Sequence, residues 1–66
     1  MRIRINGEGV DHVAASDLQT VLGAHATTGE GVAVAVNRQL VPRARWGQTC
    51  LVENDEIDVF RVIAGG

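Results

Sequence analysis

The amino-acid sequence predicts an α+β fold in which one helix packs on one face of a mixed sheet of four to five strands. Three observations lead to this prediction. Residues 1–5 alternate apolar and charged side chains, as a half-buried strand does. Residues 32–36 and 56–63 are further apolar segments of strand length. Only the segment 16–26 carries apolar side chains at helical spacing.

The chain length limits how the fold can be stabilised. The 66 residues make one domain, 1–66, near the lower size limit for independent folding. One cysteine, Cys50, forms no internal disulfide, and two histidines are too few for a four-ligand zinc site. We therefore expect no metal and a core of packed aliphatic residues. Cys50 is expected to be a small buried hydrophobe rather than a redox thiol.

Charge and hydropathy exclude several classes of partner. The net charge is −2, without a basic stripe, which argues against nucleic acid. No stretch approaches the ~20 apolar residues of a membrane span. The first residues lack a signal-peptide hydrophobic block, so we expect a cytoplasmic protein. All six basic residues are arginine, which reflects either codon bias or the advantage of having no amine near an activated acyl group.

The N-terminal region predicts a β-hairpin. "MRIRIN" is the first strand, and Asn6-Gly7 is a strong signal for a tight turn. "VDHVAA", residues 10–15, is the expected second strand.

The following segment, 16–26, predicts a short helix. Ser16 and Gln19 match a capping box, and Asp17 in the first turn suits the helix dipole. One stripe of side chains is expected to face the core; it comprises Leu18, Val21, Leu22 and His25. His25 is expected to pack half-buried in this stripe rather than to act as a catalytic base.

The second half of the chain predicts the rest of the sheet. "VAVAV", 32–36, is apolar on both faces, so it is a central strand or has one face open to a partner. "QLV" is expected to be a short extended segment. Pro42, which follows it, indicates that this region is an edge strand or irregular. Trp46 is expected to close one end of the core.

The last strand, 56–63, predicts a partner-binding face. Ile57 and Val59 are expected to face the helix, whereas Asp58, Phe60 and Val62 face the other side, continued by Ala33 and Ala35. An exposed apolar patch usually marks a partner site. A register slip that turns Phe60 into the core is the alternative. The acidic residues nearby either meet a basic partner or form a solvated turn; they are Glu53, Asp55, Glu56 and Asp58.

The sequence ends "AGG", residues 64–66. Glycine accepts backbone angles that other residues avoid, and it has no side chain to clash with the walls of a cleft. We expect a flexible tail of Ala64, Gly65 and Gly66 that reaches roughly 10 Å when extended.

Two stretches carry a family resemblance. "VAVAVNRQLVPRARW" combines a valine-alanine strand, an Asn-led turn, "VPR" and a tryptophan, and "NDEIDVFRVIAGG" combines an acidic turn, the last strand and the diglycine end. With this layout the chain resembles the ubiquitin-like β-grasp roll, and more closely the ThiS-type sulfur carriers of thiamine biosynthesis. The resemblance covers nearly the whole chain.

The resemblance implies a chemistry for Gly66. An adenylating enzyme would use ATP to activate its carboxylate, and a sulfur donor such as a cysteine desulfurase would convert it to a thiocarboxylate. A thiazole synthase would then take the sulfur. The protein would be a co-substrate, with no catalytic residue, bound cofactor or metal of its own.

Three alternatives stay open from the sequence. One is the small subunit of molybdopterin synthase, which has the same tail chemistry but usually a longer chain. The second is a ubiquitin-like modifier conjugated to lysines. The third is a binding module whose Gly-Gly end has no role.

Overall fold

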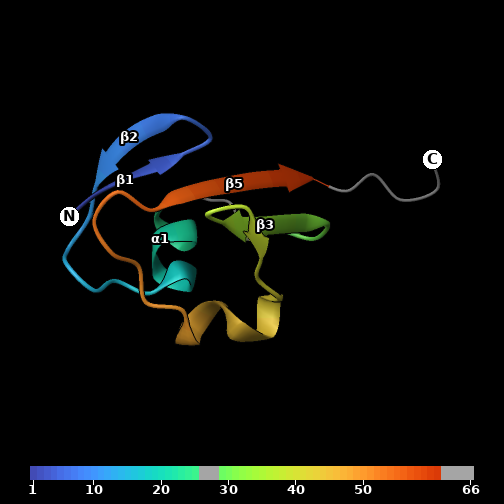
Figure 1. Cartoon of the computed structure of the whole chain (residues 1–66). Helices are drawn as coiled ribbons and strands as arrows, with labels where there is room; N and C mark the ends of the chain where they lie inside the picture. The colour runs from blue at the N-terminus through green and yellow to red at the C-terminus, as the bar shows by residue number, and fades with distance from the viewer. Residues whose placement is uncertain (26–28, 62–66) are drawn as a thin grey trace.

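The five strands of the computed structural model form one mixed sheet, in the order β2-β1-β5-β3-β4 (Figure 1). The structure describes residues 1–25 and 29–61. Within them, β1 runs parallel to β5, and the other strand pairs are antiparallel. The elements in chain order are β1 (Arg2–Ile5), β2 (Glu8–Asp11), α1 (Leu18–Ala24), β3 (Val32–Val36), β4 (Gln39–Leu40), the 3₁₀ helix η1 (Arg43–Gln48) and β5 (Glu56–Arg61).

Two-residue turns close both hairpins. Asn6 and Gly7 take φ values of 51° and 84°, and Asn37 and Arg38 take 51° and 70°. Positive φ at both central residues is the type I′ requirement, which matches the twist of the flanking strands. The predicted turn at Asn6-Gly7 and the predicted Asn-led turn are therefore confirmed.

The second strand begins earlier than predicted. β2 spans Glu8–Asp11 rather than 10–15, because a two-residue turn lets pairing resume at once, with Ile5 opposite Glu8. The ladder ends beside the beginning of β1, where the His12 N–H donates to the Met1 carbonyl at 2.9 Å. The chain beyond His12 turns toward α1 instead of continuing the sheet.

The helix is shorter than predicted and has a different cap. Asp17, not Ser16, is the N-cap, and its carboxylate accepts hydrogen bonds from the Thr20 N–H at 3.0 Å and the Thr20 hydroxyl at 2.7 Å. The Ser16 hydroxyl donates backward to the Val13 carbonyl at 2.7 Å. Serine and aspartate both cap helices well. Because Ser16 and Asp17 are adjacent, the sequence alone does not decide which of them begins the helix.

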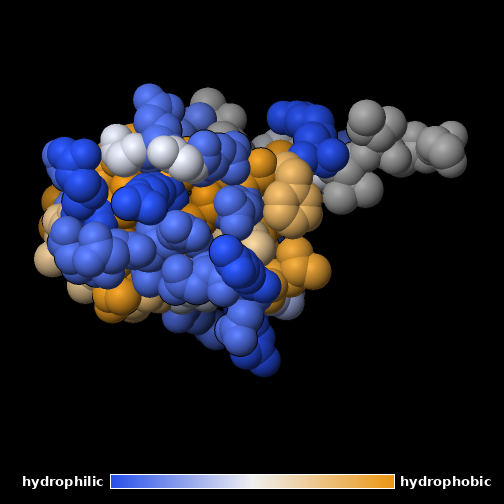
Figure 2. All heavy atoms as spheres, turned by 45° about the horizontal axis from the view of Figure 1, so that its top comes forward, coloured by the Kyte–Doolittle hydropathy of each residue, from blue (hydrophilic) through white to orange (hydrophobic). Residues whose placement is uncertain are grey.

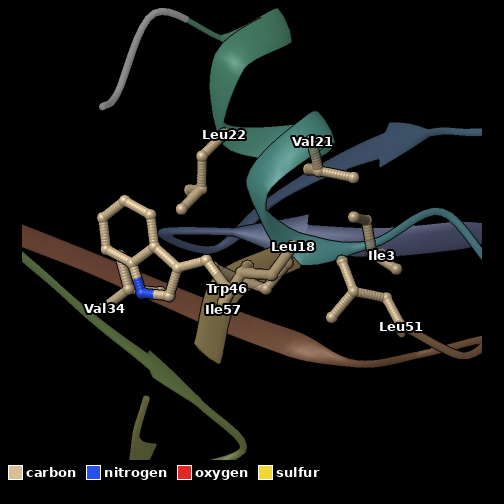
Figure 3. Packing of buried hydrophobic residues seen from close by; sticks show 8 residues of the cluster. All are labelled: Ile3, Leu18, Val21, Leu22, Val34, Trp46, Leu51 and Ile57. Atoms are coloured by element: carbon tan, nitrogen blue, oxygen red, sulfur yellow. The ribbon is translucent and has the colours of Figure 1, made fainter. Parts of the chain in front are cut away.

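The core lies between the sheet and the layer formed by α1 and η1, which lie on the same side of the sheet (Figure 1). Figure 3 shows the helix side chains Leu18, Val21 and Leu22 pointing toward the strands. The buried cluster joins these to Ile3, Val34, Trp46, Leu51 and Ile57. Within residues 1–25 and 29–61, no helix is long and apolar enough to cross a membrane.

Trp46 closes one end of this core, as predicted. It is only 2% exposed, and its Nε1–H donates to the Val41 carbonyl at 2.9 Å. The Arg43 guanidinium lies 4.5 Å from the ring centroid, on its outer side. Pro42 precedes η1, and β4 is the edge strand, in agreement with the predicted edge or irregular segment.

Two predictions of burial are wrong. Cys50 is exposed. Residues 49–51 pair with residues 16–18, since the Leu18 N–H donates to the Thr49 carbonyl and the Leu51 N–H donates to the Ser16 carbonyl. This strand-like pairing turns Leu51 inward and Cys50 outward. His25 is exposed at the end of α1 instead of packing in the apolar stripe, because the helix stops at Ala24.

Candidate partner-binding surface

β5 is the central strand of the sheet, and its two faces differ in burial. Ile57 is 1% exposed and Val59 packs against the core cluster. Phe60, which points to the opposite face, is 45% exposed and lies outside that cluster. For Ile57 to Phe60 the predicted assignment of faces is confirmed, and the alternative of a register slip that buries Phe60 in the core is excluded.

Strand register gathers apolar side chains beside Phe60. Residues paired across strands share a face. Phe60 pairs with Ala33, Asp58 pairs with Ala35, and Ala35 pairs with Leu40 on the edge strand. We call the apolar members of this group the outer apolar patch: Phe60, Ala33, Ala35 and Leu40.

Exposure of the outer apolar patch is uneven. Leu40 is 71% exposed, whereas Ala35 is nearly covered by its cross-strand neighbours. In Figure 2, which brings the outer face forward, polar atoms cover much of the surface, and apolar atoms gather at the end of the molecule where β5 finishes. An exposed apolar patch on one side of a small domain is typical of a protein contact site.

Sequence reasoning missed Leu40. The Asn37-Arg38 turn could have predicted its position. A two-residue loop puts Val36 opposite Gln39 and therefore Ala35 opposite Leu40. A hollow of about 330 Å³ adjoins the patch, with Ala33 and Leu40 in its lining next to Val41 and Pro42. The apolar surface thus extends past the sheet edge toward η1.

The acidic residues around the start of β5 do not form one solvated turn. Asp55 is 8% exposed and accepts hydrogen bonds from Val52 N–H and Asn37 Nδ2, both at 2.9 Å. Glu53 accepts from the Arg2 N–H at 3.1 Å. Glu56 lies 3.3 Å from Arg4 in an exposed ion pair. The expectation of a solvated turn is wrong for Asp55, whose carboxylate organises the loop before β5.

Asp58 lies with Phe60 on the outer face and is half-buried beside Ala35. The remaining predicted site residues, Val62, Ala64, Gly65 and Gly66, lie outside the described residues. Among the residues that are described, no group of three or more histidine, cysteine or acidic side chains could hold a metal ion.

Comparison with known proteins identifies the family. A model of the ThiS family matches residues 2–66. This chain belongs to the ThiS family. The sulfur carrier protein ThiS of Escherichia coli (strain K12) is 35% identical over 66 residues, which span the whole of both chains.

A second kind of ThiS relative is much longer. The thiazole synthase of Magnetococcus marinus is 36% identical over 66 residues, and the matched part is 20% of its length. The thiazole synthase of Paramagnetospirillum magneticum is 29% identical, again over 20% of its length. The chain therefore spans about a fifth of these two relatives.

Solved structures confirm the β-grasp fold. The crystal structure of the thiamine biosynthesis protein ThiS from Geobacter metallireducens superposes with a TM-score of 0.85 and covers both chains completely, at 23% sequence identity. A solution structure of a thiamine biosynthesis protein from the same organism gives 0.74. The mixed five-stranded sheet with one α-helix is thus the ThiS form of the roll.

Proposed function

We propose that this ThiS-family chain is a sulfur carrier of thiamine biosynthesis and not a catalyst. The observation that carries the proposal is the end-to-end match to the E. coli sulfur carrier protein, 35% identical over 66 residues. The diglycine end and the exposed patch on β5 are the features of this chain that suit the role.

The reactive group would be the carboxylate of Gly66. A carboxylate resists nucleophilic attack, because attack places a second negative charge beside the first. An adenylating enzyme would use ATP to make the mixed anhydride with AMP and release pyrophosphate. The persulfide of a sulfur donor such as a cysteine desulfurase would then displace AMP to give an acyl disulfide on Gly66. A second thiol would cleave this disulfide, forming a new disulfide with the donor and leaving the thiocarboxylate on Gly66.

The tail composition suits that reaction. The carboxylate must reach the phosphorus of ATP inside another protein. Residues 64–66 would extend roughly 10 Å, and Gly65 and Gly66 bring no side chain to the walls of a narrow cleft. Ordering a backbone residue costs about 1–2 kcal/mol, so docking of the folded surface must offset the ordering of the tail.

The outer apolar patch would provide that docking. Phe60 and Leu40 are its exposed members; Ala33 pairs with Phe60, and Ala35 pairs with Leu40. A few residues near the centre of an interface, often aromatic ones, contribute most of the binding free energy. Asp58 beside them would pair with a basic group of the activating enzyme, and Val62 would continue the contact along the last strand.

Thiazole synthase would be the sulfur acceptor. The two longer relatives support this assignment, because in each a segment similar to this chain is part of a protein called thiazole synthase. A carrier and its acceptor that occur in one polypeptide in some organisms are expected to bind each other when they are separate.

A sulfur-transfer assay tests the acceptor. The thiocarboxylated protein is supplied with thiazole synthase in one reaction and with the large subunit of molybdopterin synthase in another. We expect sulfur loss only with thiazole synthase, and none from a variant that lacks Gly66. Transfer only to the molybdopterin enzyme would assign the chain to that pathway, and stable adducts on lysines of other proteins would assign it to the ubiquitin-like modifiers.

A further inference from the structure

The two histidines of the chain come together on the surface, away from the outer apolar patch. His12 follows β2 and His25 follows α1, yet their Nε2 atoms lie 2.9 Å apart. The ring centroids are 5.1 Å apart, with 65° between the ring planes. At that separation the rings meet nearly end-on, so one Nε2–H donates to the bare Nε2 of the other ring.

The backbone fixes both histidines. The His12 N–H donates to the Met1 carbonyl at 2.9 Å, and the Met1 amino group donates to the His12 carbonyl at 2.6 Å. The His25 N–H donates to the Leu22 carbonyl at 3.2 Å at the end of α1. The sheet and the helix therefore bring the two rings together before any ligand arrives, which reduces the entropy lost on binding.

We propose that His12 and His25 form a two-imidazole binding site for a divalent transition-metal ion of the Ni²⁺ or Cu²⁺ class. The ion would lie beside the two nitrogens, and both rings would turn in place so that their Nε2 lone pairs, which lie along the hydrogen bond in this structure, point toward it. The donating ring would move its proton from Nε2 to Nδ1 through solvent, so both rings stay neutral and no oxidation or reduction is involved.

The separation of the nitrogens is compatible with this class of ion. Two imidazole nitrogens at right angles around a metal, each at about 2.05 Å, are about 2.9 Å apart, whereas tetrahedral ligands are about 3.3 Å apart. The hydrogen-bonded distance of 2.9 Å between His12 and His25 therefore suits right-angled coordination once the rings have turned toward the ion. Square-planar and tetragonal nitrogen sites are typical of Cu²⁺ and Ni²⁺, and these ions also bind nitrogen ligands more strongly than earlier divalent metals.

The site would be open rather than structural. The described residues hold no cluster of three or more metal-ligating side chains, so water would complete the coordination. Because the strand and helix position both rings before any ion binds, the fold does not depend on the ion. The proposal is independent of the proposed sulfur-carrier function.

Calorimetric titration with Ni²⁺ tests the site, using tag-free protein in a Cys50→Ser background to remove the exposed thiol. We expect binding of one ion per chain. His12→Ala and His25→Ala should each weaken binding by roughly tenfold or more, because the second ligand of a chelating pair binds at high effective concentration. The double variant should bind more weakly still, because it lacks the one imidazole that each single variant keeps.

Asp11→Ala is the matched control, since this exposed carboxylate is next to His12 in sequence. It should leave Ni²⁺ affinity unchanged, and far-UV circular dichroism should show that every variant keeps its fold. The proposal is overturned if the parent protein does not bind, if only one of the two histidine substitutions weakens binding, or if Asp11→Ala weakens it as much as they do.

Discussion

Asn37 and Asp55 are joined by a hydrogen bond of 2.9 Å between the Asn37 amide nitrogen and the Asp55 carboxylate. The bond ties the β3–β4 turn to the loop that precedes β5. Asn37 also accepts from the Glu56 N–H at 3.0 Å and donates its own N–H to the Glu56 carbonyl at 2.7 Å. The start of β5 is therefore positioned by side chains as well as by the sheet ladder.

Asn37→Gly should lower the free energy of unfolding by about 1–3 kcal/mol, because it leaves the buried Asp55 carboxylate short of a partner. Glycine is the suitable replacement, since position 37 has a φ of 51° and alanine would add backbone strain. Urea denaturation measures the change. As a control, Arg38→Gly keeps a positive-φ residue in the same turn and should change stability little. Equal stability of wild type and Asn37→Gly would contradict a structural role for the bond.

Trp46→Ala should lower the free energy of unfolding by about 3–5 kcal/mol, as other large-to-small core substitutions do. A single small core rarely supplies more than ~3–5 kcal/mol, so this variant is expected to be largely unfolded. Trp46→Phe should remain folded but be less stable, because it loses the hydrogen bond to the Val41 carbonyl. Thermal unfolding by circular dichroism distinguishes the two variants, and a fully folded Trp46→Ala protein would show that Trp46 does not close the core.

Asp17 should make stability depend on pH at the acid end. Hydrogen bonds from the Thr20 hydroxyl and then the Thr20 N–H hold the pKa of Asp17 below its ordinary value of 3.8. Because the folded pKa is the lower one, the stabilisation is present above pH 3.8 and is lost as the pH falls below that value. Asp17→Ser retains a capping side chain but has no charge.

The test for Asp17 is the difference in urea midpoint between wild type and Asp17→Ser across pH. The other carboxylates are common to both proteins, so their titration cancels. We expect a constant difference in the neutral range that narrows in acid. A difference that does not change with pH would show that the charge of Asp17 contributes nothing to the cap.

Phe60→Ala should weaken binding to the activating enzyme by roughly tenfold or more while the domain stays folded, since exposed aromatic residues often anchor interfaces. Leu40→Ala should have a smaller effect in the same direction. Val13, 80% exposed and outside the outer apolar patch, provides the control substitution Val13→Ala. Unfolding of Phe60→Ala, or equal binding by all three variants, would contradict docking through this face.

The sequence could predict those parts of the fold that short-range chemistry determines. Both type I′ turns follow from Asn at the required positions, and the alternation of Ile57, Asp58, Val59 and Phe60 predicted the two faces of β5. The parallel pairing of β1 with β5 has no local signal, and it was not predicted beyond the expectation of a mixed sheet.

The failures concern residues whose environment depends on long-range packing. Cys50 and Leu51 are both apolar, and only the pairing with residues 16–18 decides which one is buried. Asp55 resembles its acidic neighbours in sequence, but Asn37, which is distant along the chain, makes it a buried acceptor. The contact between His12 and His25 likewise depends on where β2 and α1 end.

Intact-mass spectrometry tests the central claim most directly. The protein is incubated with ATP, the activating enzyme and a sulfur donor, beside a matched variant that lacks Gly66. We expect the wild-type mass to rise by the difference between one sulfur and one oxygen atom, with the change located at Gly66 by fragmentation, and the variant to stay unmodified. An unchanged wild-type mass with an activating enzyme that modifies another ThiS protein in the same assay would contradict the proposed function.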